Sequence, residues 1–218
     1  MILFRIYFIY KINKMDGEKV IKVDIWSDIA CPWCYVGETN FKIARDSFLK
    51  SNPNVKIETI FHAYMIDPAT KEEGEEYLAY NRRRWGGDGW TYSLREAGKK
   101  IGCNFANWKT WPNTYKGHTL IAAGKKIGKG EEVLDEIFTQ CYEEGQNVSL
   151  EDTLNKIADK FGIKEWNTKE NQKSVVRDDQ TGKRAYDIHG VPYFIIGKYV
   201  LEGAQPPKAF LSAFTKSM

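Results

Sequence analysis

Apolar and polar residues alternate along two segments near the start of the chain. Residues 20–26 and 55–64 carry an apolar side chain at nearly every second position and are rich in β-branched residues, so each is predicted to form a strand. Between them, residues 35–50 have apolar positions at helical spacing. A strand, a helix and a strand make a βαβ unit, which favours parallel pairing of the two strands.

A long helical block follows this unit. We predict no strand between residues 67 and 180, and helical patterns cover 75–85, 91–101, 114–127, 133–144 and 150–161. Residues 191–196 and 199–201 then indicate a hairpin around a Gly-Lys turn, and a last helix is predicted over 208–216. The sequence therefore predicts an α/β fold in which a β-α-β part and a β-β-α part enclose a large all-helical insertion.

Composition and charge narrow the function classes. The chain has 218 residues, 42% of them hydrophobic and 28% charged, which is ordinary for a globular protein with a substantial core. The 32 basic and 29 acidic residues leave a net charge of +3. So small an excess predicts neither nucleic-acid binding nor a polybasic membrane anchor. The sequence leaves monomer and homodimer both open.

The first residues form an apolar segment. Residues 1–10, MILFRIYFIY, are too few for a membrane span, which needs about 20 apolar residues. Arg5 interrupts the apolar run, and no small-residue cleavage site follows, unlike in a signal peptide. We interpret residues 1–18 as a disordered N-terminal extension, with a targeting segment as the alternative.

The four cysteines bear on the redox compartment. Cys31 and Cys34 are close together, whereas Cys103 and Cys141 stand alone. Secreted domains held by disulfides are usually shorter and denser in cysteine. The pattern favours a cytoplasmic protein with one reactive pair and two structural thiols. The apolar N-terminus leaves an organellar or secretory compartment as the alternative.

The paired cysteines belong to the motif Cys31-Pro32-Trp33-Cys34, between the first predicted strand and the first predicted helix. A cysteine at a helix start faces free backbone N–H groups and the positive end of the helix dipole, which favour a thiolate over a thiol. The thiolate is the attacking species in disulfide exchange, and Cys34 one turn on can resolve the mixed disulfide. Pro32 suits the first helical turn, and Trp33 is a candidate for tuning the redox poise or contacting substrate.

Zinc binding is the main alternative for this motif. Structural zinc takes four ligands, usually from two paired motifs. The other candidate ligands are single and form no paired spacing; they are Cys103, Cys141, His62, His118 and His189. We therefore predict no metal and no organic cofactor, only the redox-active cysteine pair.

A second motif, Gly190-Val191-Pro192, opens the late strand. Proline cannot donate a hydrogen bond to a sheet, so Pro192 belongs at a strand start or edge. The simple interpretation is that Pro192 only marks the start of this strand. A cis Val191–Pro192 bond facing the cysteines is the sharper alternative, and only about 5–6% of X–Pro bonds are cis.

These motifs resemble one family. The segments that carry the resemblance are SDIACPWCYVG at 27–37, GVPYF at 190–194 and GAQPP at 203–207. Together with the helical block, they resemble the DsbA-like thioredoxin family and most closely its FrnE-like branch, over nearly the whole chain. We expect a thioredoxin-like domain over 19–66 and 182–218, and an inserted helical domain over 67–181.

The resemblance implies a thiol–disulfide oxidoreductase. Cys31 is then the nucleophile, Cys34 the resolving thiol and Pro192 a cis proline, and the backbone of Val191 binds an extended substrate chain. Implied substrates are protein or peptide thiols and disulfides, with glutathione as a candidate co-substrate. The Pro-Trp dipeptide differs from the Pro-His of periplasmic DsbA, so the strong oxidising poise of that enzyme is not implied. Oxidase, reductase and isomerase all remain open.

Two other functions stay under consideration. Glutathione-dependent kappa-class transferases and hydroxychromene-carboxylate isomerases share this architecture but carry Ser where this chain has Cys31. A non-catalytic module whose helical block binds a partner is the third interpretation, and it predicts that alkylating both thiols has no effect.

Lesser candidates lie around these motifs. Asp24 and Asp28 flank the cysteine pair, and Asp28 is interpreted as a turn or capping residue rather than a proton relay. His62 and His118 are interpreted as lying in or beside the helical interface, and His189 as a surface-loop residue, with an approach to the cysteines as the alternative. Cys103 and Cys141 are interpreted as inert apolar thiols of the helical block. Four tryptophans of this block are interpreted as core residues, with a substrate groove as the alternative for some of them: Trp85, Trp90, Trp108 and Trp111.

Overall fold

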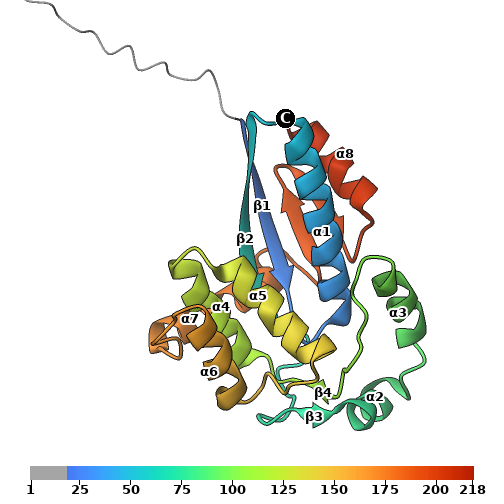
Figure 1. The fold of residues 1–218 in the computed structure, drawn as a ribbon, viewed down its shortest axis with the longest axis vertical. Helices are drawn as coiled ribbons and strands as arrows, with labels where there is room; N and C mark the ends of the chain where they lie inside the picture. Colours follow the sequence, from blue (N-terminus) through green and yellow to red (C-terminus); the bar gives the residue numbers. More distant parts are fainter. Residues whose placement is uncertain (1–18) are drawn as a thin grey trace, which may run out of the picture.

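A four-stranded sheet lies at the centre of the protein, whose structure is a computed structural model describing residues 19–218 (Figure 1). The predicted extension over residues 1–18 lies outside the described residues. The sheet order is β2-β1-β5-β6, with strands β1 (Lys19–Ser27), β2 (Val55–Ala63), β5 (Tyr193–Ile196) and β6 (Tyr199–Glu202). β1 pairs in parallel with β2 and antiparallel with β5, which in turn pairs antiparallel with β6. The predicted α/β fold is confirmed.

Strand β1 separates a buried face from a more polar one. Ile21, Val23 and Ile25 are at most 2% exposed, whereas the alternating position Lys22 is exposed. The three apolar residues belong to one buried cluster with Phe41 of α1 (Pro32–Ser51) and with α8 (Pro207–Ser217). Figure 1 shows both helices alongside the sheet. Because α1 packs against the buried face of the sheet, the direction of this helix is fixed, and so is the position of its first turn.

Helices fill the segment between β2 and β5. They are α2 (Tyr77–Trp85), α3 (Thr91–Lys99), α4 (Tyr115–Lys126), α5 (Gly130–Phe138), α6 (Glu151–Lys160) and α7 (Lys169–Arg184). Figure 1 shows α4 to α7 gathered on one side below the sheet, and α2 and α3 on the other side. The start of α1 lies between these two groups.

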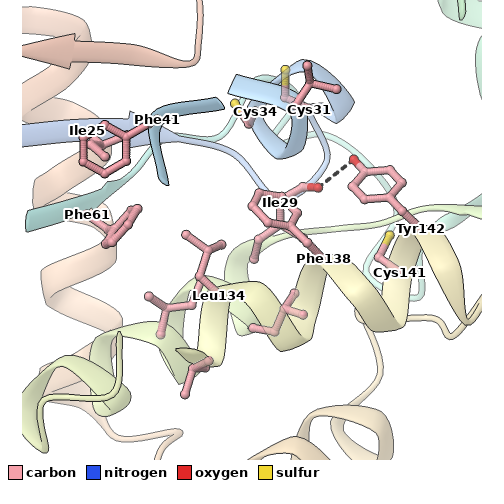
Figure 2. Packing of buried hydrophobic residues seen from close by; sticks show 14 of the residues in the cluster. Ile25, Ile29, Cys31, Cys34, Phe41, Phe61, Leu134, Phe138, Cys141 and Tyr142 are labelled. Carbon is pink, nitrogen blue, oxygen red and sulfur yellow. Dashed lines mark hydrogen bonds between the residues drawn. The ribbon is translucent and has the colours of Figure 1, made fainter. Parts of the chain in front are cut away.

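The helical insertion and the sheet share one buried cluster. Leu134 and Phe138 of α5 are at most 2% exposed and belong to the same cluster as Ile25 of β1 and Phe61 of β2 (Figure 2). Burying aromatic and branched side chains is the main stabilising term in folding. The insertion therefore supplies part of the core on which the start of α1 rests.

The insertion contains a short two-stranded ribbon that the sequence pattern does not predict. β3 (Glu75–Glu76) pairs antiparallel with β4 (Thr110–Trp111). The prediction that residues 67–180 contain no strand is therefore wrong. The helix predicted from residue 75 begins at Tyr77 instead. The reason is local, because the Glu76 carboxylate caps α2 by accepting hydrogen bonds from the next free N–H groups.

The helix predicted over 133–144 is two elements. α5 starts earlier, at Gly130, and ends at Phe138, and a π-helical turn, η1 (Thr139–Glu143), continues it. Within this turn, the hydroxyl of Tyr142 donates a 2.8 Å hydrogen bond to the carbonyl oxygen of Ile29, in the loop after β1 (Figure 2). π-helical turns are rare in proteins, but those that occur are frequently found at functional sites.

Helix α7 is absent from the sequence-based prediction. Its buried positions are mostly small or polar, namely Asn171, Val175, Asp179 and Gly182, so apolar periodicity is weak. The domain boundary expected between residues 181 and 182 falls inside this helix. Gly182 lies against the indole of Trp26, where a Cβ atom would come within 2.6 Å of Cδ1. This close packing against Trp26 acts together with polar contacts of Asp178 and Asp179, in place of a hydrophobic stripe, to hold α7 on the sheet.

Candidate active site

The motif Cys31-Pro32-Trp33-Cys34 lies at the N-terminus of α1. Cys31 is the N-cap residue with extended backbone (φ −86°, ψ 107°), and Pro32 occupies the first turn as predicted. The backbone N–H of Cys34 donates to the carbonyl oxygen of Cys31 at 2.9 Å. The Cys31 side chain therefore starts where backbone N–H groups of the helix lack intrahelical partners.

The two sulfurs have different surroundings. Cys31 is 8% exposed and its thiol lies 3.5 Å from the carbonyl oxygen of Val191, whereas Cys34 is 0% exposed and accepts from the backbone N–H of Asp28 at 3.4 Å. Burial raises the pKa of Cys34 well above its usual range, and the neighbouring Cys31 thiol raises it further. Both residues are free thiols. Of the two, Cys31 is the sulfur that an incoming group can reach.

The loop before β5 faces these cysteines. The Val191–Pro192 peptide bond is cis, the geometry that the family resemblance implies. The Pro192 carbonyl oxygen accepts from the backbone N–H of Gly203 at 2.8 Å. Gly37 of α1 lies under the proline ring, because a Cβ atom there would come within 2.7 Å of its Cγ. The sequence therefore predicts both segments, and the structure brings Val191 and Cys31 together.

Asp28 organises the backbone just before Cys31. It is 1% exposed, and its carboxylate accepts hydrogen bonds from the backbone N–H groups of Ile66 (2.8 Å) and Ala30 (3.3 Å). Nε2 of His118, from α4, lies 3.3 Å from the same carboxylate. These contacts fit the predicted turn role of Asp28, and they tie the loop to the helical insertion.

An apolar groove opens beside Cys31. Trp111 at its wall is 1% exposed, and Trp85 is 51% exposed. Trp108 packs in the core instead. The groove is lined by Cys31, Pro32, Trp33, Ile66, Trp85, Trp90 and Trp111. The sequence alone does not decide whether four of the tryptophans are core residues or line a substrate groove. Three of these four line the groove in the structure.

Glu38 is a buried acid that the sequence analysis does not single out. It is 1% exposed, and the Ser27 hydroxyl donates to its Oε1, while Oε2 has no hydrogen-bond partner among the residues the structure describes. Burial raises the pKa of Glu38 to about 8, and Lys42 partly opposes this rise. Helical spacing gives a signal for it, because residue 38 lies one turn after Cys34 on the buried face of α1.

His62 belongs to a separate polar cluster. Its Nε2 lies 2.7 Å from Oδ1 of Asp24, and its Nδ1 lies 3.5 Å from Oδ1 of Asp178 in α7. The ring stacks on Trp26 with a centroid distance of 4.3 Å. Lys125 of α4 also contacts Asp178 at 3.3 Å. This cluster joins α4 and α7 to the sheet. Asp24 of β1 contacts His62 of β2 within it, so its role is structural.

The remaining candidates lie away from the groove. His189 has an 83% exposed side chain and pairs with Asp187 at 3.2 Å, as expected for a surface loop. Cys103 and Cys141 are each 1% exposed, and burial raises the pKa of both thiols. Within residues 19–218, no group of three or more His, Cys, Asp or Glu side chains is arranged to hold a metal ion. Over the same residues, no helix is long and apolar enough to cross a membrane.

The family model of the DSBA-like thioredoxin domain matches residues 22–215. The chain belongs to this family. Members of this family are generally disulfide oxidoreductases. The fold, the cysteine pair at the start of α1 and the facing cis proline are consistent with membership. This DsbA-like assignment covers the sheet and the helical insertion together.

This DsbA-like chain is similar to a relative in sequence and to two solved structures in fold. It is 26% identical over 208 residues to the uncharacterized protein YwbO of Bacillus subtilis, covering 89% of this chain and 96% of YwbO. The probable DsbA oxidoreductase SCO1869 from Streptomyces coelicolor superposes with a TM-score of 0.76 at 23% identity, over 90% and 89% of the two chains. A 2-hydroxychromene-2-carboxylate isomerase gives a TM-score of 0.64 at 14% identity, over 89% and 95%. The FrnE-like branch stays a prediction.

Proposed function

We propose that this DsbA-like protein exchanges disulfides with polypeptide substrates, with Cys31 as nucleophile and Cys34 as resolving thiol. The observation that carries the proposal is the asymmetry of the pair. Cys31 lies at a helix N-terminus, on an apolar groove and beside the Val191 carbonyl, whereas Cys34 is 0% exposed. Helix N-termini favour a thiolate over a thiol, and the thiolate is the attacking species.

The proposed reaction runs through a mixed disulfide. The Cys31 thiolate attacks one sulfur of a substrate disulfide, and the other substrate sulfur leaves as a thiolate that takes a proton from solvent. The Cys34 sulfur then attacks Sγ of Cys31, and the second substrate thiol is released. The substrate disulfide is reduced by two electrons, and the pair is oxidised to a disulfide. The reverse sequence oxidises a substrate dithiol.

Neighbouring residues have distinct proposed roles. Pro32 fixes the first turn of α1, and Trp33 forms part of the groove wall next to the reacting sulfur, where it tunes the redox poise. The backbone of Val191, at the cis Pro192, receives an extended substrate chain. Extended chains are recognised through backbone hydrogen bonds, which suits proteins of many sequences.

The groove favours polypeptide substrates over free glutathione. Apart from the Cys31 thiol, its lining consists of apolar side chains, three of them indoles of α2 and the segments around it. Such a lining buries an apolar side chain next to a substrate cysteine but gives no ion-pair partner to the carboxylates of glutathione. Glutathione is then a reductant or oxidant of the pair rather than the preferred substrate.

Insulin reduction by dithiothreitol tests the proposal. The wild type is expected to accelerate precipitation of the insulin B chain, and Cys31→Ser is expected to abolish the acceleration. Cys103→Ser is the matched control, because this buried thiol lies 3.3 Å from Oγ1 of Thr39, which can also bond a serine hydroxyl. Activity retained by Cys31→Ser, or unaffected by alkylation of both motif thiols, would contradict an exchange role and favour a non-catalytic binding module.

The direction of exchange follows from the reduction potential of the pair. We propose to measure it by titration in glutathione buffers, where about 30 mV corresponds to 1.4 kcal/mol for this two-electron couple. A potential well below that of the glutathione couple indicates a reductase. A potential above it indicates an oxidase or isomerase.

A glutathione-dependent isomerase is the second candidate, favoured by the likeness to 2-hydroxychromene-2-carboxylate isomerase. The thiol of Cys31 argues against it, because the resemblance implies Ser at that position in such enzymes. An isomerisation assay with that carboxylate and glutathione separates the two functions. Turnover that survives in Cys31→Ser supports the isomerase.

A further inference from the structure

One polar group in the wall of the groove has no partner. Nε1 of Trp111 is buried and makes no hydrogen bond with any residue that the structure describes. The side chain is 1% exposed and lines the groove together with Cys31. Because buried donors are nearly always paired and an unpaired one costs free energy, this N–H group calls for an explanation.

The other tryptophans of the chain have an acceptor or contact with solvent. Two of them, Trp33 and Trp85, are at least partly exposed, so water can bind their N–H groups. Four further indole N–H groups donate to a carbonyl or amide oxygen at 2.9–3.3 Å, and they belong to Trp26, Trp90, Trp108 and Trp166. Trp111 therefore differs from the other six in being both buried and unpaired.

Packing holds the ring of Trp111 in its orientation. The indole stacks on Tyr80 with a centroid distance of 4.0 Å and an interplanar angle of 9°. An indole N–H lies in the plane of its ring, so it does not point at the face of a nearly parallel neighbour. Trp108 lies at 6.0 Å and 31°, and the backbone of Trp111 pairs with Glu75 in the β3–β4 ribbon. The direction of the N–H bond is therefore set by packing and not by a hydrogen bond.

We propose that the indole N–H of Trp111 donates a hydrogen bond to a carbonyl oxygen of the substrate chain while that chain is joined to Cys31. This contact rests on the proposed disulfide exchange at Cys31 and adds a substrate-binding residue to it. A neutral peptide carbonyl fits better than a carboxylate, because no charged side chain lines the groove. Together with the backbone of Val191, the indole gives an extended chain a second point of contact beside the reacting sulfur.

Burial makes this N–H group an effective donor. An exposed donor exchanges a hydrogen bond with water for one with the substrate, whereas Nε1 of Trp111 is already shielded from solvent. To reach it, the substrate carbonyl has to displace part of the groove wall. Trp85 has the most room to move, because it is 51% exposed and precedes Gly86 and Gly87, where an added Cβ would meet nothing within 4 Å. The hydrogen bond is thus gained only when substrate binds.

The nuclear magnetic resonance signal of the Trp111 indole N–H tests the contact. Cys34→Ser, carrying nitrogen-15 tryptophan, is joined at Cys31 either to a cysteine peptide with acetylated and amidated ends or to the methylthio group of methyl methanethiosulfonate, which has no carbonyl. The signal is assigned from its Overhauser effects to the ring of Tyr80. It is expected to move downfield in the peptide adduct and to stay in place in the methylthio adduct, whereas the signal of Trp166, outside the groove, stays in place in both. A Trp111 signal that does not move, or that moves equally in both adducts, overturns the proposal.

Trp111→Phe tests the same contact by kinetics. The variant is expected to react about three- to tenfold more slowly with a disulfide of the peptide and thionitrobenzoate, and at the wild-type rate with methyl methanethiosulfonate. Trp108→Phe is the matched control, because its indole N–H donates to Thr110 within the core, so the ratio of the two rates is expected to stay at the wild-type value. A wild-type ratio in Trp111→Phe overturns the proposal, and the indole signal decides the matter if this variant does not fold. A Cys34→Ser protein that forms neither adduct refutes the exchange function itself.

Discussion

Cys31 and Cys34 have the same chemistry and different positions. Cys31 is the N-cap residue of a helix at the edge of a groove, whereas the sulfur of Cys34 lies inside the protein, where burial raises its pKa. Because the thiolate is the attacking form, this difference assigns the two steps of exchange to different residues. The loop before Cys31 keeps this arrangement through the buried carboxylate of Asp28 and the hydroxyl of Tyr142.

Gly37→Ala tests the contact between α1 and the cis-proline loop. The added Cβ would come within 2.7 Å of Cγ of Pro192 and 3.2 Å of Cα of Ala204, so the loop must shift. We expect a loss of about 1–3 kcal/mol in the free energy of unfolding, and slower insulin reduction. Gly190→Ala in the same loop is the control, because its Cβ meets nothing within 4 Å. Equal effects of both variants would contradict this packing role.

Glu38 also predicts a pH dependence of stability. Its pKa is about 8 in the folded protein and about 4.5 in the unfolded chain, so the folded state binds the extra proton between these values. The contribution of Glu38 to the free energy of unfolding is fully present below pH 4.5. It is lost as the pH rises through 8, by up to about 1.4 kcal/mol per pH unit. Urea unfolding at pH 5 and pH 8 should therefore show Glu38→Gln gaining stability relative to the wild type at the higher pH. A pH-independent difference would contradict a neutral buried Glu38.

Single residues were predictable where chemistry and spacing coincide. The cysteine pair and Pro192 stand in short motifs, so the sequence locates them. Glu38 lies among helix residues whose burial depends on how α5 packs against α1, and Ile66 reaches the groove only through the path of the chain after β2. Helical spacing places Glu38 on the same face of α1 as Cys34, but the depth of its burial, like the position of Ile66, follows from tertiary contacts that a local pattern does not contain.

At the scale of elements, hydrophobic periodicity predicts the strands and most helices. β1, β2 and the β5–β6 hairpin alternate clearly, and each is found where expected. The two-residue strands β3 and β4 are too short for any period. α7 has mostly small or polar residues on its buried face, so it gives no apolar stripe.

Gly182→Ala tests how α7 is held on the sheet. The added Cβ would come within 2.6 Å of Cδ1 of Trp26, and this clash opposes the gain of about 0.5–1 kcal/mol that alanine brings to a helix. We expect a net loss of about 1–2 kcal/mol in the free energy of unfolding, with a changed tryptophan fluorescence. Gln180→Ala, at an exposed position of the same helix, is expected to be neutral or slightly stabilising. Stabilisation by Gly182→Ala would show that α7 does not pack tightly there.

At the scale of the whole molecule, one core joins the sheet to the helical insertion. Residues of β1, α1, α5 and α8 belong to a single buried cluster, and the loop before Cys31 binds Tyr142 and His118 of the insertion. The groove likewise combines the start of α1 with tryptophans of the insertion. The active site therefore depends on both parts being folded together.

This continuity predicts a cooperative unfolding transition. Far-UV circular dichroism reports the helices, and tryptophan fluorescence reports Trp26 of the sheet, Trp33 of α1 and the five tryptophans of the insertion. The two signals are expected to give coincident urea transitions, because neither part has a separate core. Two separated transitions would contradict a shared core and indicate an independently folding insertion.

The most direct test of the central claim is to trap the mixed disulfide. In Cys34→Ser, the resolving sulfur is absent, so a peptide disulfide added to the reduced variant is expected to stay attached to Cys31. Peptide mapping by mass spectrometry should then find one substrate chain on Cys31 and none on Cys103 or Cys141, which are each 1% exposed. Attachment to another cysteine, or no covalent adduct under conditions where the wild type reacts, would contradict the assignment of Cys31 as the nucleophile.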